Sequence, residues 1–186
     1  MLAYVLWRHP RAGSSTRMVY EASLFAFHER LRNAGISGFR SSSTSIVPKV
    51  PWVGEIDCHE EWYVLDGWET LGALSEAAVS GEQKAAYDLV THSSSIHAAT
   101  LYRLRRGTCN VESPVAVWFS KPEKMALWVM EELLAPYLDL PKSGLWQRQL
   151  ALGPAPEFCF LGEHAWQHEQ VPGIVVYRHK FAPALL

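Results

Sequence analysis

The sequence predicts an α+β protein made of two consecutive units, each with the element order β-α-β-β-α-β. Three observations lead to this prediction. Residues 59–81 alternate like a strand and then continue at helical spacing. Short stretches of the first half recur in the same order in the second. The second half, however, has only residues 162–173 where the first has a full helix, which predicts a truncated second helix in that unit.

Residues 59–81 are the clearest strand-to-helix unit. The run from Glu61 to Leu65 alternates in β-branched and aromatic residues, as strands do. Asp66 and Glu69 have the spacing of a capping box, which predicts that Asp66 caps the following helix. Gly81 is a typical residue beyond a helix end.

The rest of the first half supplies the remaining elements of one unit. Leu2–Trp7 is a predicted strand, and a helix capped within Ser14–Thr16 is expected to run to Ala34. That helix has an apolar stripe at helical spacing: Tyr20, Leu24, Phe27, Leu31 and Ala34. A weak strand over 38–46, a helical segment over 82–90 and a strand over 98–105 complete the order.

The second half repeats this pattern. Val115–Ser120 is a predicted strand, and Ser120 with Glu123 forms a capping box before a helix over 125–138. Further matches pair 37–40 with 143–146, 61–65 with 157–161 and 101–105 with 176–180. We therefore predict repeats at 1–108 and 109–186 in one compact unit. The matches place Trp7 on Trp118, Tyr102 on Tyr177 and Gly38 on Gly144.

The truncated helix has a consequence for assembly. The strands of the second half remain apolar, and soluble proteins rarely leave a large apolar patch in water. The C-terminal residues 181–186, another subunit or a ligand could cover the face. We expect a homodimer with Trp166 and residues 181–186 near the contact.

Composition indicates a compact globular protein. Hydrophobic residues make up 48% of the 186 residues and charged residues 19%, and eight tryptophans suit a large core. A formal charge of −2 gives no electrostatic basis for nucleic-acid binding. No apolar run approaches a membrane span. The three widely separated cysteines predict a cytoplasmic protein with reduced thiols.

Two β-α-β-β-α-β units in tandem are ferredoxin-like, and together they resemble the dimeric α+β barrel superfamily, here in a single-chain, pseudo-dimeric form as in its chlorite-dismutase-like members. The resemblance implies two four-stranded antiparallel sheets facing each other, with helices outside. It also implies an enzyme that is cofactor-free or haem-associated, since the superfamily contains both kinds. No motif signals haem, and no catalytic residue is carried over.

Several residues are candidates for binding a ligand. In this superfamily the pocket usually lies between sheet and helices, so His28, at the edge of the apolar stripe, is a candidate base or ligand donor. A structural boundary histidine is the alternative. Trp62 and Arg40 could converge on the same pocket, and His59, Glu60 and Trp62 at the head of the central strand could line its mouth; the alternative is that these strand-end residues are simply solvated.

Two arginines form a second candidate set. Arg103 and Arg178 each follow a tyrosine in the last predicted strand of a unit. If they face the interior, they need carboxylate partners, which Glu61 and Glu157 could supply. The alternatives are structural ion pairs and an anion site.

His164 and His168 are a candidate metal pair. Their spacing would place both imidazoles on one face of a helix, as metal ligands require. The motif lacks the HExxH order, and a solvated polar loop is the alternative.

Two functions from different classes follow. The first is an enzyme acting on a small hydrophobic, aromatic molecule in a pocket where a few polar groups converge. The second is a non-catalytic ligand-binding or assembly protein. No phosphate loop and no nucleophile elbow is present in the sequence.

Overall fold

The computed structural model describes residues 1–11, 17–166 and 168–180. The first half contains β1 (Leu2–Pro10), α1 (Arg17–Asn33), β2 (Phe39–Val47), β3 (Cys58–Leu65), α2 (Trp68–Ala78), α3 (Gln83–Ser93) and β4 (Ser94–Gly107). The second contains β5 (Val115–Phe119), α4 (Leu127–Leu138), β6 (Gly144–Leu152), β7 (Phe158–Gly162), β8 (Ile174–Tyr177) and β9 (His179–Lys180). The predicted cap within Ser14–Thr16 and the contact through residues 181–186 lie outside the described residues.

All strands join one antiparallel sheet in the order β8-β5-β7-β6-β4-β1-β3-β2-β9. The first half contributes β4-β1-β3-β2 and the second β8-β5-β7-β6, and the β4–β6 pairing joins them. β8 pairs with β5, and β9, one residue further along the chain, pairs with β2 at the opposite edge. One short segment thus brings the two edges together, which gives a nearly closed barrel of strands with helices outside.

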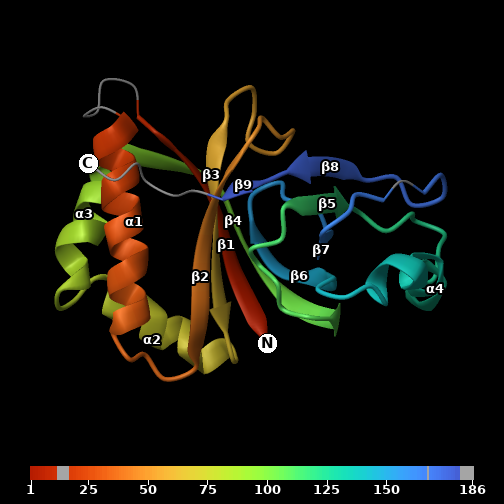
Figure 1. Ribbon diagram of the computed structural model, residues 1–186, viewed down its shortest axis with the longest axis horizontal. Coiled ribbons are helices and arrows are strands. Elements are labelled where there is room, and N and C mark those ends of the chain that lie inside the picture. Colours follow the sequence, from red (N-terminus) through yellow and green to blue (C-terminus); the bar gives the residue numbers. More distant parts are fainter. Residues whose placement is uncertain (12–16, 167, 181–186) are drawn as a thin grey trace.

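The alternation of each strand divides the core into separate layers. Residues facing the barrel interior form one aromatic cluster, which includes Trp7, Trp62 and Trp118. On the outer face of the first half, side chains pack against α1, α2 and α3. On the outer face of the second half they pack against α4. Figure 1 shows α1, α2 and α3 on one side of the molecule and α4 at the far end.

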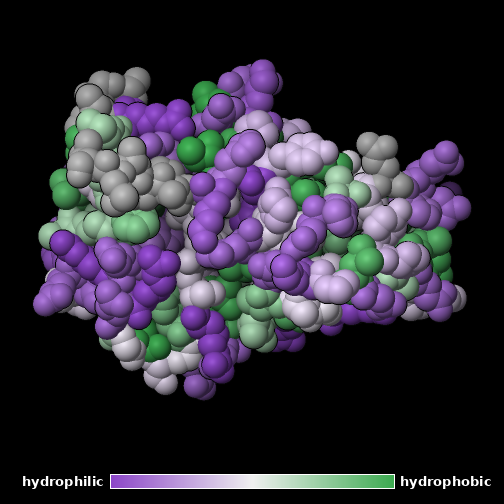
Figure 2. All heavy atoms as spheres, viewed as in Figure 1, coloured by the Kyte–Doolittle hydropathy of each residue, from purple (hydrophilic) through white to green (hydrophobic). Residues whose placement is uncertain are grey.

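The apolar stripe of the first predicted helix is confirmed. Tyr20, Leu24, Phe27 and Leu31 are all buried, and His28 beside them is buried as well. The opposite side of α1 faces solvent, and hydrophilic side chains gather over the C-terminal part of the helix in Figure 2. This amphipathic pattern places α1 on the sheet with His28 directed inward.

The caps predicted for α2 and α4 are wrong. α2 begins after Gly67, which makes no side-chain capping bond, and Asp66 instead forms an ion pair with Arg40 at 2.6 Å. α4 begins after Ala126, again without a side-chain cap, rather than at the Ser120 box. The Asp66 prediction fails because of a tertiary contact. The Asp66 carboxylate pairs with the guanidinium of Arg40 on β2, so it does not accept hydrogen bonds from the first backbone N–H groups of α2.

We therefore expect Asp66→Ala to change the free energy of unfolding by no more than about 0.5 kcal/mol, because exposed ion pairs contribute little. Urea unfolding measures the change in the free energy of unfolding. Arg40→Ala is the matched variant, because it removes the other partner of the same ion pair. A loss of about 1 kcal/mol or more from Asp66→Ala alone would indicate a capping role after all.

The second half has no second covering helix among its described residues, where the sequence predicts a truncated one. Strand β7 ends at Gly162, and the described residues of 163–173 contain no helix. The sheet face is nevertheless covered, because Trp166 is 2% exposed and packs on Phe119 and Tyr137. The expected bare face is therefore wrong, and the homodimer stays a prediction without that argument. None of the helices in the described part of the chain is long and apolar enough to cross a membrane.

Candidate functional site

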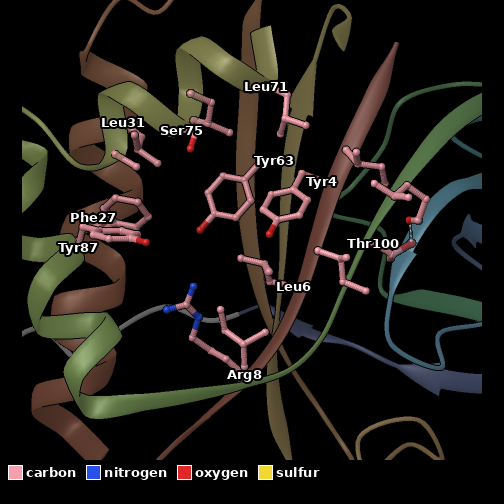
Figure 3. A pocket seen from close by; sticks show the side chains of 16 residues that line it. Tyr4, Leu6, Arg8, Phe27, Leu31, Tyr63, Leu71, Ser75, Tyr87 and Thr100 are labelled. Carbon is pink, nitrogen blue, oxygen red and sulfur yellow. Dashed lines mark hydrogen bonds between the residues drawn. The ribbon is translucent and has the colours of Figure 1, made fainter. Parts of the chain in front are cut away.

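A cavity of about 340 Å³ lies between the outer face of the first-half sheet and its covering helices. β1 and β3 form its floor, α1, α2 and α3 form its walls, and β4 and β6 reach one side. In Figure 3, Tyr4 and Tyr63 project from the sheet toward Phe27 and Tyr87 on the helices, with Arg8 below them. Apolar and aromatic side chains make up most of the lining, which is typical of small-molecule sites.

Strand alternation decides which residues reach this cavity. On β1, Tyr4, Leu6 and Arg8 face outward and line it, whereas the residues between them face the barrel interior. On β3, Tyr63 faces outward in the same way, and Trp62 faces inward. Each strand thus contributes to two different cores.

A buried polar cluster lies beside the cavity. Glu61 is fully buried, and its Oε1 lies 2.7 Å from Arg8 Nε. The Tyr63 hydroxyl donates to Glu61 Oε2 at 2.5 Å. His28 Nε2 lies 3.2 Å from the Tyr63 oxygen, 3.5 Å from Glu61 Oε2 and 3.0 Å from Thr44 Oγ1. Arg8 and Tyr63 carry this cluster to the cavity surface.

The charges of the cluster follow from its burial and its partners. Burial by itself raises the pKa of Glu61, but the Arg8 charge, the neighbouring His28 ring and the hydrogen bond from Tyr63 outweigh it and lower that pKa to about 2. Burial, together with the Glu61 charge, raises the pKa of Tyr63 well above its usual value. Burial also raises the pKa of Tyr4. At neutral pH the cavity therefore presents neutral phenols beside a paired arginine and carboxylate.

The entrance of the cavity is apolar. Ile96 of β4 and Leu150 and Leu152 of β6 line it, and they are 54%, 51% and 64% exposed. A ligand that enters here meets hydrophobic surface before it reaches Arg8 and Tyr63.

The barrel interior holds a second polar centre. Arg178 Nε donates to Glu60 Oε1 at 2.8 Å, and the indole N–H groups of Trp7 and Trp62 donate to the same carboxylate at 3.1 and 2.7 Å. Arg178 also donates to the Ser113 carbonyl at 2.7 Å. These groups lie within the aromatic cluster and line none of the described cavities. We therefore assign this centre a structural role: Arg178 lies between β8 and β9, the two strands at opposite edges of the sheet.

The structure separates the residues predicted for the site. His28 lies in the polar cluster, and His59 is buried on the same outer face, 3.2 Å from Glu21. Trp62 and Arg178 lie in the barrel interior instead. Arg40 and Arg103 are exposed to solvent. One pocket uniting them is therefore not observed among the described residues.

The predicted partners of the arginines are also wrong. Glu60, not Glu61 or Glu157, pairs with Arg178, and Glu61 pairs with Arg8. Sequence reasoning missed Arg8 because it ended the first strand at Trp7, whereas β1 continues to Pro10. With the strand extended, alternation places Arg8 beside Leu6 on the outward face and would have found it.

The structure does not support the helical geometry on which the predicted His164–His168 metal pair depends. His164 and His168 lie in a non-helical segment, so helical spacing does not bring their rings together. Among the described residues no group of at least three potential ligands could hold a metal ion. A metal at these two histidines stays an untested prediction.

The cavity does not fit a haem. Its described lining contains no histidine, cysteine or methionine to serve as an axial ligand. The remaining candidate ligands are Tyr4, Tyr63 and Tyr87, and burial raises the pKa of Tyr4 and Tyr63, which disfavours the phenolate that would bind iron at those two positions.

The chain matches no protein-family model and no curated protein. Among solved structures it is similar to an anthrone oxidase-like protein, with 12% identity, a TM-score of 0.49 and coverage of 99% of this chain and 94% of that one. It is also similar to a variant of chlorite dismutase from Candidatus Nitrospira defluvii, with 10% identity, a TM-score of 0.49 and coverage of 88% and 76%. In this chain's own strand order, two four-stranded units are joined edge to edge in one antiparallel sheet, and the helices lie outside it.

Proposed function

We propose that the first-half cavity binds a small, largely apolar aromatic molecule and that the protein acts on it by acid–base chemistry without haem. The observation that carries this proposal is the cavity of about 340 Å³ in which Arg8 and Tyr63 interrupt an otherwise mostly apolar lining. A few polar groups in an apolar pocket fix a ligand's orientation, and buried titratable groups at such a place are candidates for chemistry.

The polar groups also indicate the kind of ligand. Because Glu61 already balances the charge of Arg8, the cavity favours a neutral molecule over an anion. If a ligand oxygen gains negative charge during reaction, Arg8 stands at the cavity surface to stabilise it. A phenolic or carbonyl oxygen on an aromatic ring system meets both conditions. Binding of such a molecule without chemistry is the second proposal, which the exposed apolar entrance favours.

We also propose that the two halves, 1–108 and 109–186, are tandem copies of one unit. Their strand orders correspond, and both Trp7 and Trp118 face the barrel interior, with ring centroids 5.2 Å apart. Trp7 is paired with Glu60 and Trp118 with Cys159, so the inner positions of β3 and β7 correspond as well.

Two of the matches drawn from sequence do not hold in the strand pairing. If Trp7 corresponds to Trp118, then Ala3 corresponds to Pro114. Ala3 pairs with Tyr102, whereas the Pro114 carbonyl accepts a hydrogen bond from the Arg178 backbone N–H. Arg178, not the exposed Tyr177, thus stands in the place of Tyr102. By the same pairing Gly144 matches Ser43, not Gly38.

The binding proposal predicts that Ser75→Trp blocks the cavity. Ser75 lines it from α2, so an indole there fills the space that a ligand needs. With 2-naphthol as the probe, we expect Ser75→Trp to weaken binding at least about tenfold, which equals about 1.4 kcal/mol. Isothermal titration calorimetry measures it. Ala73→Trp, an exposed position on the same helix that does not line the cavity, is the control. Equal affinity of the two variants would contradict the site.

A further inference from the structure

We propose that Tyr63, His28 and Thr44 form a proton path from the cavity to a second cleft, with Glu61 as the fixed charge beside it. The inference rests on the proposed function, because it assigns to Tyr63 the exchange of a proton with the bound molecule. Tyr63 is then the catalytic residue that touches the ligand, and His28 and Thr44 act through it.

The path is continuous in the structure. Tyr63 lines the cavity, and its hydroxyl lies 2.5 Å from Glu61 Oε2 and 3.2 Å from His28 Nε2. The phenol hydrogen can turn from one acceptor to the other without any movement of the backbone. The same His28 nitrogen lies 3.0 Å from Thr44 Oγ1. Each step is thus within hydrogen-bond distance.

The far end of the path opens to a different surface. A cleft of about 80 Å³ is lined by His28 and Thr44, together with Ser42 and Ser43 of β2. His28 is 4% exposed and Thr44 is half-buried, so Thr44 is the more exposed of the two residues. His28 therefore separates two spaces, a mostly apolar one for the ligand and a polar one for water.

The charges favour movement of a proton along this route. A hydroxyl proton of the ligand passes to the Tyr63 oxygen while the proton of Tyr63 passes to His28 Nε2. The ligand becomes an oxyanion beside Arg8, and the imidazolium is balanced by Glu61. His28 then releases its proton through Thr44 to water in the cleft. No oxidant or reductant is consumed, and the reverse sequence delivers a proton to the cavity.

Other titratable and charged groups surround the path. They are Tyr4 and Arg8 on β1, Tyr20, Glu21 and Arg32 on α1, His59 on β3, Tyr87 on α3, and Glu112 and Lys180 at the cleft. His59 is the best-matched comparison for His28, because it is equally buried but bonds to Glu21 rather than to Tyr63.

Excited-state proton transfer from bound 2-naphthol tests the path directly. Light makes this phenol strongly acidic, and its anion emits at a longer wavelength than its neutral form. In the full-length protein we expect emission mainly from the anion. Tyr63→Phe and His28→Gln should lower the anion-to-neutral emission ratio at least about threefold, whereas His59→Gln should keep the wild-type ratio. Calorimetry on each variant shows that the probe is still bound, and circular dichroism shows that each is folded.

The outlet is tested with a second matched pair. A pH-indicator dye in the solvent reports proton release after a light flash. Thr44→Val keeps the shape of the side chain but removes the hydroxyl, and we expect slower release. Thr44→Ser keeps the hydroxyl and should release at the wild-type rate. Equal rates in the two variants would overturn Thr44 as the outlet.

The outcomes separate this inference from the function on which it rests. Absence of saturable 2-naphthol binding to the wild type overturns the proposed function and the path with it. If the probe binds and the emission ratio is the same in wild type, Tyr63→Phe and His28→Gln, the binding site stands and the path is overturned. A decrease in His59→Gln as large as that in His28→Gln also overturns it, because the effect is then general electrostatics.

Discussion

Replacement of Arg178 by methionine is expected to destabilise the protein by about 3–5 kcal/mol, because it leaves a buried charge without its partner. Both side chains of the Arg178–Glu60 pair are 1% exposed. Methionine preserves much of the volume of the arginine stem but cannot balance the carboxylate. The Trp7 and Trp62 indoles still donate to Glu60, yet neutral donors do not replace a guanidinium.

Urea unfolding of two further variants locates the effect. Glu60→Gln combined with Arg178→Met removes both charges, so we expect the double variant to be more stable than Arg178→Met alone. Arg103→Met changes an exposed arginine on β4 and should shift the free energy of unfolding by no more than about 0.5 kcal/mol. If Arg178→Met behaves like Arg103→Met, the interior pair has no stabilising role.

The second large effect expected is a loss of stability in acid that depends on Glu61. The pKa of this carboxyl is about 2 in the folded protein, against an ordinary value of 4.5. Because the folded value is the lower one, the stabilisation is fully present above pH 4.5 and is lost as pH falls toward 2. A difference of this size corresponds to about 3 kcal/mol by linkage.

Unfolding free energies measured in steps from pH 6 to pH 2 test this expectation. Glu61→Gln has no carboxyl to titrate at this position, so its stability should fall less steeply over the same range, although it starts lower because Arg8 loses its partner. Glu55→Gln, which alters an exposed carboxylate with 87% side-chain exposure, should retain the wild-type slope. If the free energy of unfolding of Glu61→Gln falls with pH as steeply as that of the wild type, other groups control the loss of stability in acid.

These two predictions concern adjacent residues on one strand. Glu60 faces the barrel interior, and Glu61 faces the helix-covered side with the cavity. A strand directs successive side chains to opposite faces, so β3 carries one carboxylate to each core. Glu60 stabilises the closure of the barrel near β9, whereas Glu61 organises the candidate site.

Much of the architecture was predictable because it depends on local periodicity. The stripe from Tyr20 to Leu31 places α1 on the sheet, and alternation over β3 makes it a strand buried on both faces. The short segment after β7 predicts a truncated helix, and its described residues form no helix at all. Boundaries were less accurate where no local signal marks them, as at the end of β1, which continues past Trp7.

The candidate site was only partly predictable. His28 follows from the helical stripe, but its partners Tyr63, Glu61 and Thr44 come from strands separate from it in sequence. A pattern of one strand shows which residues share a face, not which residue of another element meets them. Charge pairing was wrong for the same reason, since Asp66 pairs with Arg40 across two elements and not with its own helix.

The sequence by itself determined the order of the main elements and their apolar faces, because these depend on spacing along the chain. Only the tertiary structure decided which buried groups meet: Arg178 with Glu60, Arg8 with Glu61, and His28 with Tyr63. The physical reason is that a buried charge must find its partner in three dimensions. The register between strands selects that partner, and a shift of one residue would have sent each side chain to the other face.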